Sequence, residues 1–139
     1  MHLDPARFLL QNGALVLGAG VLCGVPFYLA IVLGWRPERI RGWRVAHATL
    51  LADGLLLLVA GILLPALDAG SFWRDALAWS LVISAWGFVF ALGGGAAAGR
   101  RGLVPWPLGW DSLFFVGHAV GAVGSAIGTA LLAVALLRR

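Results

Sequence analysis

Charged residues are scarce in this sequence. They make up 12% of its 139 residues, lysine is absent, and all ten basic residues are arginine. Soluble domains carry about a quarter charged residues, so this composition argues against a protein that is soluble in water. Cysteine is nearly absent too, and the lone Cys23 excludes an internal disulfide and a thiolate metal cluster. Apolar residues reach 61%, with a mean hydropathy of +0.95, which indicates lipid as the solvent.

Four apolar runs predict four transmembrane helices, at residues 13–35, 45–67, 76–94 and 113–137. Each run is close to the ~20 residues that an α-helix needs to cross ~30 Å of hydrocarbon. Strands of a β-barrel would alternate polar and apolar residues, and these runs do not. We therefore expect an all-α integral membrane protein, a four-helix bundle that forms one domain over residues 1–139.

The formal charge of +4 would suggest a nucleic-acid partner for a soluble protein. Nearly all the arginines flank the apolar runs, however, so we interpret them as headgroup anchors in a lipid bilayer and expect no nucleic-acid partner. Loops 36–44 and 95–112 carry more of the arginines than the opposite side does. This asymmetry favours a location of both loops on the cytoplasmic side of a bacterial inner membrane. The two groups are Arg36, Arg39, Arg41, Arg44, Arg100 and Arg101 against Arg7, Arg74, Arg138 and Arg139.

Three acidic or histidine side chains lie within the apolar runs, namely His47, Asp53 and His118. Such groups are costly in lipid and are candidates for a functional site. From the helical rise, His47 is ~5 Å and His118 ~10 Å below the arginine-rich surface, whereas Asp53 is ~14 Å deep. The small neighbours Ala46 and Ala48 leave room beside His47 for a bulky planar cofactor. The alternative is a hydrogen-bonded interior histidine.

Glycines four residues apart occur in the first and fourth runs. This spacing lets two helix backbones approach closely, and it predicts tight helix contacts either within the chain or between copies of it. The pairs are Gly20 and Gly24, Gly117 and Gly121, and Gly124 and Gly128. In the third run, Trp79 and Trp86 lie seven residues apart and so on one face, where they either pack or line a planar ligand.

Residues 42–47, Gly-Trp-Arg-Val-Ala-His, are followed by Asp53-Gly54 and by residues 63–67, Leu-Leu-Pro-Ala-Leu. This pattern resembles the corresponding helix of the styrene oxide isomerases. Further similarity occurs at Trp86 and at Arg101-Gly102-Leu103. The first and fourth apolar runs are similar to that family in character only.

The resemblance implies a haem b enzyme, a homotrimer with haem near the subunit contacts and with His47 as the proximal ligand of the iron. In that family the ferric iron acts as a Lewis acid on a small lipophilic epoxide, and a 1,2-hydride shift yields an aldehyde. This sequence departs from the family at Asp53, where the family has an asparagine near the haem, and at Leu92, where it has a tyrosine that helps position the epoxide. A protonated Asp53 can donate a hydrogen bond as the amide does, which makes it the candidate catalytic residue.

Haem bound at His47 would direct its propionates toward the arginine-rich surface, because carboxylates in hydrocarbon are costly. The candidate partners are Arg41, Arg44, Arg100 and Arg101, whose planar guanidinium groups can bind a carboxylate in bidentate fashion. Trp86 is a further candidate contact of the cofactor. The alternative for the four arginines is a role as headgroup anchors alone.

Two other functions stay open at this point. His118 has no counterpart in the family pattern and can serve as a second iron ligand, which would give a bis-His cytochrome or a redox or gas sensor. The third possibility is a structural membrane subunit without a cofactor, in which His47 and Asp53 only link helices.

Overall fold

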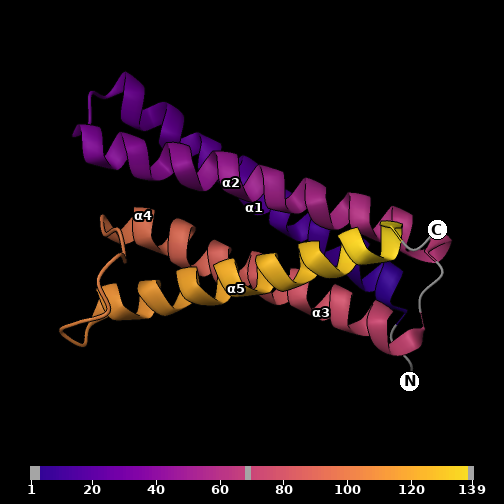
Figure 1. The fold of residues 1–139 in the computed structure, drawn as a ribbon. Helices are drawn as coiled ribbons and strands as arrows, with labels where there is room; N and C mark the ends of the chain where they lie inside the picture. Colours follow the sequence, from indigo (N-terminus) through magenta and orange to yellow (C-terminus); the bar gives the residue numbers. More distant parts are fainter. Residues whose placement is uncertain (1–3, 68–69, 138–139) are drawn as a thin grey trace.

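Two helical hairpins cross each other in the structure (Figure 1). The first contains α1 (Pro5–Val32) and α2 (Pro37–Leu63), and the second contains α3 (Ser71–Phe88) and α5 (Trp110–Leu137). The computed structural model describes residues 4–67 and 70–137, and within these ranges the regular elements are all helices. All four long helices are sufficiently long and apolar to cross a membrane, which confirms the predicted all-α, four-span architecture.

Each long helix begins earlier than its apolar run. α1 begins at Pro5 rather than near residue 13, and the amide of Ala6 donates to the Asp4 carboxylate at 3.0 Å. α2 begins at Pro37 rather than near residue 45. Proline suits the first helical position because its φ is preset and no amide is lost there. The predicted boundaries were late because hydropathy detects only the part of a helix in hydrocarbon, and helices extend beyond it into the polar interface.

The third span is not a uniform α-helix. α3 passes into η2, a π-helical segment from Val89 to Gly94, and then into the short α4 (Gly95–Ala98). Single π-helical turns occur frequently at functional sites, because they redirect side chains within an otherwise regular helix. In this protein η2 places Ala91 and Leu92 beside a cavity between α2 and the segment that leads to α5.

The glycines of α5 face α3. A β-carbon on Gly128 would lie 2.5 Å from Leu81, and one on Gly121 would lie 2.8 Å from Phe88. The Ser84 hydroxyl donates to the Gly121 carbonyl at 2.6 Å, across the same contact. The predicted tight packing of this glycine face is therefore confirmed, and its partner is a helix of the same chain.

The glycines of α1 pack against α2 in a similar way. A β-carbon on Gly20 would lie 2.8 Å from the backbone nitrogen of Leu51. On α2, a β-carbon on Gly54 would lie 2.6 Å from the backbone nitrogen of Leu17 in α1. The two helices thus approach at backbone distance, with glycine supplied from both sides.

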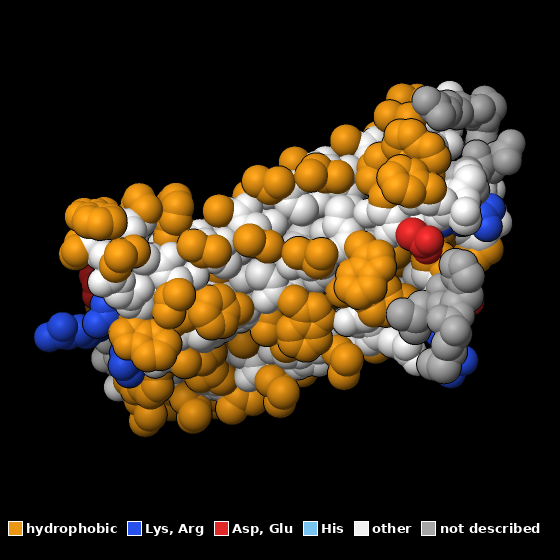
Figure 2. Space-filling view, turned by 90° about the horizontal axis from the view of Figure 1, so that it is seen from below, with side chains coloured by type: hydrophobic (Ala, Val, Ile, Leu, Met, Phe, Trp, Pro, Cys, Tyr) orange, Lys and Arg blue, Asp and Glu red, His pale blue; other side chains and the backbone are white. Residues whose placement is uncertain are grey.

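Apolar side chains also cover the outside of the molecule. One face carries hydrophobic groups along nearly its whole length, with charged groups toward the ends (Figure 2). The α1–α2 turn and the segment between α4 and α5 lie at the same end (Figure 1), so the arginines of residues 36–44 and 100–101 gather there, as predicted. Arg138 and Arg139, which entered the orientation prediction, lie outside the described residues, and membrane sidedness stays a prediction.

Candidate functional site

His47 is held against α1. Its Nδ1 lies 2.8 Å from the carbonyl oxygen of Gly20, and the two form a hydrogen bond. A β-carbon on Gly24 would lie 3.1 Å from Nδ1 and Cε1 of the imidazole, so glycine at this position is what leaves space for the ring. The Phe27 ring lies beyond, with its centroid 6.1 Å from that of His47. Backbone and glycines of α1 therefore orient this half-buried imidazole.

This arrangement suits a histidine that binds iron. A carbonyl oxygen can only accept, so Nδ1 carries a proton, and in a neutral imidazole Nε2 then keeps its lone pair, which is the usual arrangement of a metal-binding histidine. Among the described residues, no three histidine, cysteine, aspartate or glutamate side chains converge on a possible metal site. A single protein ligand is sufficient for the iron of a haem, whose macrocycle supplies four nitrogen donors, and His47 fits that requirement.

Asp53 lies on the interior stripe of α2. It follows Ala46 and Leu50 and precedes Leu57 at helical spacing, and these three neighbours are at most 1% exposed. Its Oδ2 is buried and finds no hydrogen-bond partner within residues 4–67 and 70–137. Asp53 is ~9 Å deeper than His47 and about 120° away around the helix. A role for both at one centre therefore requires a ligand that reaches around α2.

Trp86 links α3 to α1. Its indole N–H donates to the Asn12 side-chain oxygen at 2.9 Å, and Asn12 in turn donates to the carbonyl of Phe8. Trp79, seven residues earlier, packs its ring 4.7 Å from that of Phe8. Trp86 is 42% exposed, so its outer face remains available to a ligand or to lipid. No sequence pattern pointed to Asn12 as the partner of Trp86.

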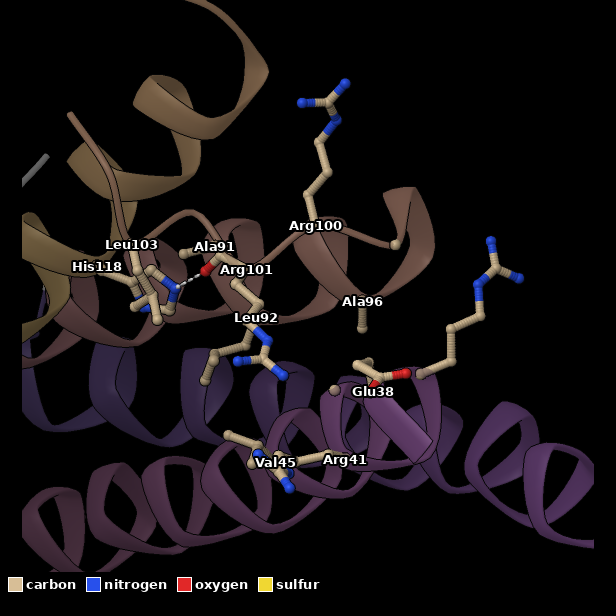
Figure 3. Close-up of a pocket in the computed structure, with 13 residues that line it drawn as sticks. Glu38, Arg41, Val45, Ala91, Leu92, Ala96, Arg100, Arg101, Leu103 and His118 are labelled. Carbon is tan, nitrogen blue, oxygen red and sulfur yellow. Dashed lines mark hydrogen bonds between the residues drawn. The ribbon is translucent and has the colours of Figure 1, made fainter. Parts of the chain in front are cut away.

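A cavity of about 470 Å³ opens between α2, η2 and the segment that leads to α5. Arg41, Arg101 and His118 line it together with Leu92 (Figure 3). The side chain of Arg101 projects between Leu92 and Arg41, whereas that of Arg100 points away. Glu38 is the carboxylate in the wall. Neither His47, Asp53, Trp86 nor Arg44 lines this cavity.

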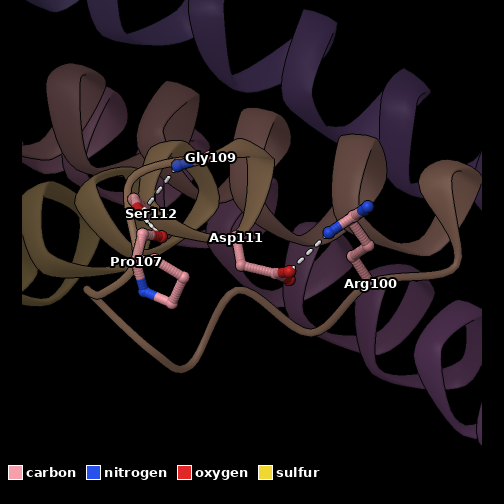
Figure 4. Close-up of polar contacts among 5 residues, drawn as sticks. All are labelled: Arg100, Pro107, Gly109, Asp111 and Ser112. Carbon is pink, nitrogen blue, oxygen red and sulfur yellow. Dashed lines mark hydrogen bonds and ion pairs between the residues drawn. The ribbon is translucent and has the colours of Figure 1, made fainter.

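Arg100 is already paired. Its guanidinium lies 2.6 Å from Oδ2 of Asp111 at the start of α5 (Figure 4). Next to this pair, the Ser112 hydroxyl donates to the Pro107 carbonyl at 2.9 Å and accepts from the amide of Gly109. The acidic first turn of α5 and the Arg100 side chain thus hold the connecting segment in place.

The two candidate histidines have different surroundings. His118 Nε2 lies 3.2 Å from the carbonyl oxygen of Arg101, and its ring is near that of Phe88. The hydrogen bond and the ring contact of His47 are both with α1. The structure therefore groups Arg41, Arg100, Arg101 and His118 at one cavity, and it places His47, Asp53, Trp86 and Arg44 elsewhere. Depth below the surface could not predict this separation, because it ignores the direction in which each side chain points.

Comparison with known proteins gives one family. The sequence model of the styrene oxide isomerase family matches residues 5–137, which include all four long helices. A search of curated proteins found no match. The family match extends the resemblance of the second and third apolar runs to nearly the whole chain, and this chain belongs to the styrene oxide isomerase family.

Proposed function

We propose that this protein binds haem b through His47 and isomerises a small lipophilic epoxide to an aldehyde. The family match over residues 5–137 supports the reaction class. The observation that supports the ligand is the hydrogen bond from His47 Nδ1 to the Gly20 carbonyl, which leaves Nε2 for iron. Gly24 supports it further, because a larger residue there would displace the ring.

A ferric haem held by His47 would supply a Lewis acid for the epoxide oxygen. In the rearrangement, one C–O bond of the epoxide breaks and a hydrogen moves with its electron pair to the neighbouring carbon. No external oxidant or reductant is required, because the substrate and the aldehyde are isomers. The apolar helices also admit a lipophilic substrate directly from the bilayer.

Asp53 is proposed as the polar group that faces the epoxide oxygen. Burial of its carboxyl disfavours the charged form, and the neutral form can donate a hydrogen bond in place of the family's asparagine. Support comes from the buried Oδ2, which no described residue satisfies. For the propionates, Arg44 is the preferred partner, since it lies one turn before His47 toward the surface and is exposed.

The proposal is tested by the haem content of His47→Ala, purified in mild detergent. We expect the parent protein to show a Soret band of a ferric haem with an open or water-bound axial position. We expect His47→Ala to lose this band while it still inserts and folds as a helical membrane protein, as judged by circular dichroism.

His118→Ala is the matched control, because it also removes one imidazole from a membrane helix. It should retain the haem with an unchanged spectrum. A full complement of haem in His47→Ala would refute the assignment of the iron ligand. A six-coordinate low-spin spectrum that is lost in His118→Ala would instead establish a bis-His cytochrome. A parent protein purified without haem would favour the third function, a structural membrane subunit without a cofactor.

A further inference from the structure

The segment that leads into α5 is apolar and exposed. Residues 104–110, Val-Pro-Trp-Pro-Leu-Gly-Trp, carry no charge and are called the 104–110 segment below. Four large side chains of this segment are 56–79% exposed, namely Val104, Trp106, Leu108 and Trp110. We propose that the 104–110 segment lies in the headgroup region of the bilayer and binds lipid there. None of its residues has a role in the proposed function, so the two proposals stand separately.

The 104–110 segment continues the lipid-facing surface of α5. Trp110 is the first residue of that helix, and exposed apolar side chains follow it at helical spacing along one side. They are Leu113, Val116, Val120, Val123 and Ile127. The segment lies at the arginine-rich end of the molecule, beside the start of α5 (Figure 1). When α5 spans the bilayer, the segment is therefore next to lipid headgroups.

Backbone and side chains of the segment make opposite demands on their surroundings. The amides of Val104, Trp106 and Leu108 donate to no group within residues 4–67 and 70–137. Such amides are costly in the bilayer core, so they require water or the oxygens of headgroups. The large apolar side chains are costly in bulk water instead. The headgroup region meets both demands, because it offers hydrogen-bond acceptors next to hydrocarbon.

The two tryptophans of the segment suit this region. Indole side chains collect at membrane interfaces, because the ring is apolar and its N–H donates to a polar group. The indole N–H groups of Trp106 and Trp110 donate to no residue that the structure describes, whereas that of Trp86 donates to Asn12. Phosphate and ester oxygens of lipids are suitable acceptors for both.

Contacts at both ends of the segment hold it in a fixed shape. Arg100, which precedes it, forms an ion pair with Asp111, which follows it (Figure 4). The Ser112 hydroxyl donates to the Pro107 carbonyl and accepts from the amide of Gly109. These contacts use polar groups and leave the apolar side chains exposed. A segment that is already ordered loses less conformational entropy when it enters the headgroup region.

The test is the depth of a nitroxide spin label at position 108 in phospholipid nanodiscs. Cys23 is the only cysteine, so Cys23→Ala combined with Leu108→Cys gives a single labelling site. We expect the label to lie within about 10 Å of the phosphate level. Its accessibility to a water-soluble nickel complex should fall between those of two reference labels. Arg36→Cys gives the reference in water at the same end, and Val123→Cys gives the reference in hydrocarbon.

A second substitution tests whether the apolar side chains hold the segment at this depth. Trp106→Ser should raise the nickel accessibility of the label at position 108 at least halfway to the value at position 36. Phe72→Ser is the matched control, because it removes an exposed aromatic ring at the opposite end of the molecule and should leave the depth unchanged. Circular dichroism shows whether both variants keep the helical fold.

Three results would overturn the proposal. A label at position 108 as accessible to nickel as the one at position 36 would place the segment in water. A label shielded from both nickel and dissolved oxygen would place it against protein, such as a second copy of the chain. An unchanged depth in Trp106→Ser would show that lipid does not hold the segment. If Trp106→Ser does not fold, the depths at positions 108, 36 and 123 still decide between lipid, water and protein.

Discussion

His47 and Asp53 are polar residues of one membrane helix, and the structure satisfies them differently. The imidazole is bonded to a backbone carbonyl of α1, whereas the buried Asp53 oxygen has no partner within the described residues. An unsatisfied buried polar atom typically costs about 1–3 kcal/mol. A carboxyl group retained at such a cost in a membrane helix points to a function rather than to packing.

This cost leads to a prediction for Asp53. Asp53→Asn should keep isomerase activity with styrene oxide as the probe, because the amide can donate the same hydrogen bond. Asp53→Leu should lower kcat by about a hundredfold, the usual effect when one donor to a developing oxyanion is removed. The leucine variant should be as stable as the parent or more stable, because an unpaired polar group is replaced by an apolar one. A leucine variant that unfolds readily, or that keeps its activity, would show that the carboxyl has a structural role or none.

At the scale of elements, glycine decides how closely the helices pack. On α5, Gly128 lies against Leu81, whereas on α1 a β-carbon added to Gly18 would meet no atom within 4 Å. Both are helical glycines in membrane spans, so they differ only in what surrounds them. In addition, the π-helical η2 turns Leu92 toward the cavity, at the position where the family pattern has tyrosine.

The contrast between these two glycines leads to a prediction about stability. Gly128→Ala should destabilise the protein by about 1–3 kcal/mol, because its methyl group would lie 2.5 Å from the buried Leu81 side chain. Gly18→Ala should be neutral or stabilise the protein by up to about 1 kcal/mol, since alanine favours the helix. Denaturant unfolding in mixed micelles, followed by circular dichroism, measures both. Equal stabilities of the two variants would contradict the close contact between α3 and α5.

For the whole molecule, the lateral surface is apolar and the glycine faces lie inside the chain. Exposed side chains on α1 include Leu15, Val21, Leu22 and Val25, which are 57–70% exposed. In the bilayer such a surface meets either lipid or another copy of the protein. Contacts between copies would therefore use these outer faces rather than the glycine motifs.

We predict a homotrimer with one haem per subunit, on the basis of family membership. Native mass spectrometry of the protein in mild detergent measures the mass of the assembly. Gly128→Ala should leave the oligomeric state unchanged, because that glycine faces α3 of its own chain. A parent protein that is only monomeric under these conditions would contradict the prediction, and a monomeric Gly128→Ala would place the glycine face at a subunit contact.

Hydropathy and local spacing determined the number of spans, their positions and the clustering of arginines at one end. These features depend on the composition of short segments, because lipid demands long apolar helices whatever their partners are. The motif at residues 42–47 also marked His47 as the residue to examine. Hydropathy could not locate the first residues of α1 and α2, because Pro5 and Pro37 lie outside the apolar runs.

Only the tertiary structure decided which groups meet. The spacing of Gly124 and Gly128 indicated a close contact but not its partner, because small residues permit close approach to any helix. The sequence put His47 and His118 at comparable depths, and the structure turned one toward Gly20 and the other toward Arg101. Rotation of each helix about its axis sets these directions. That rotation results from the packing of all four spans together, which no single segment encodes.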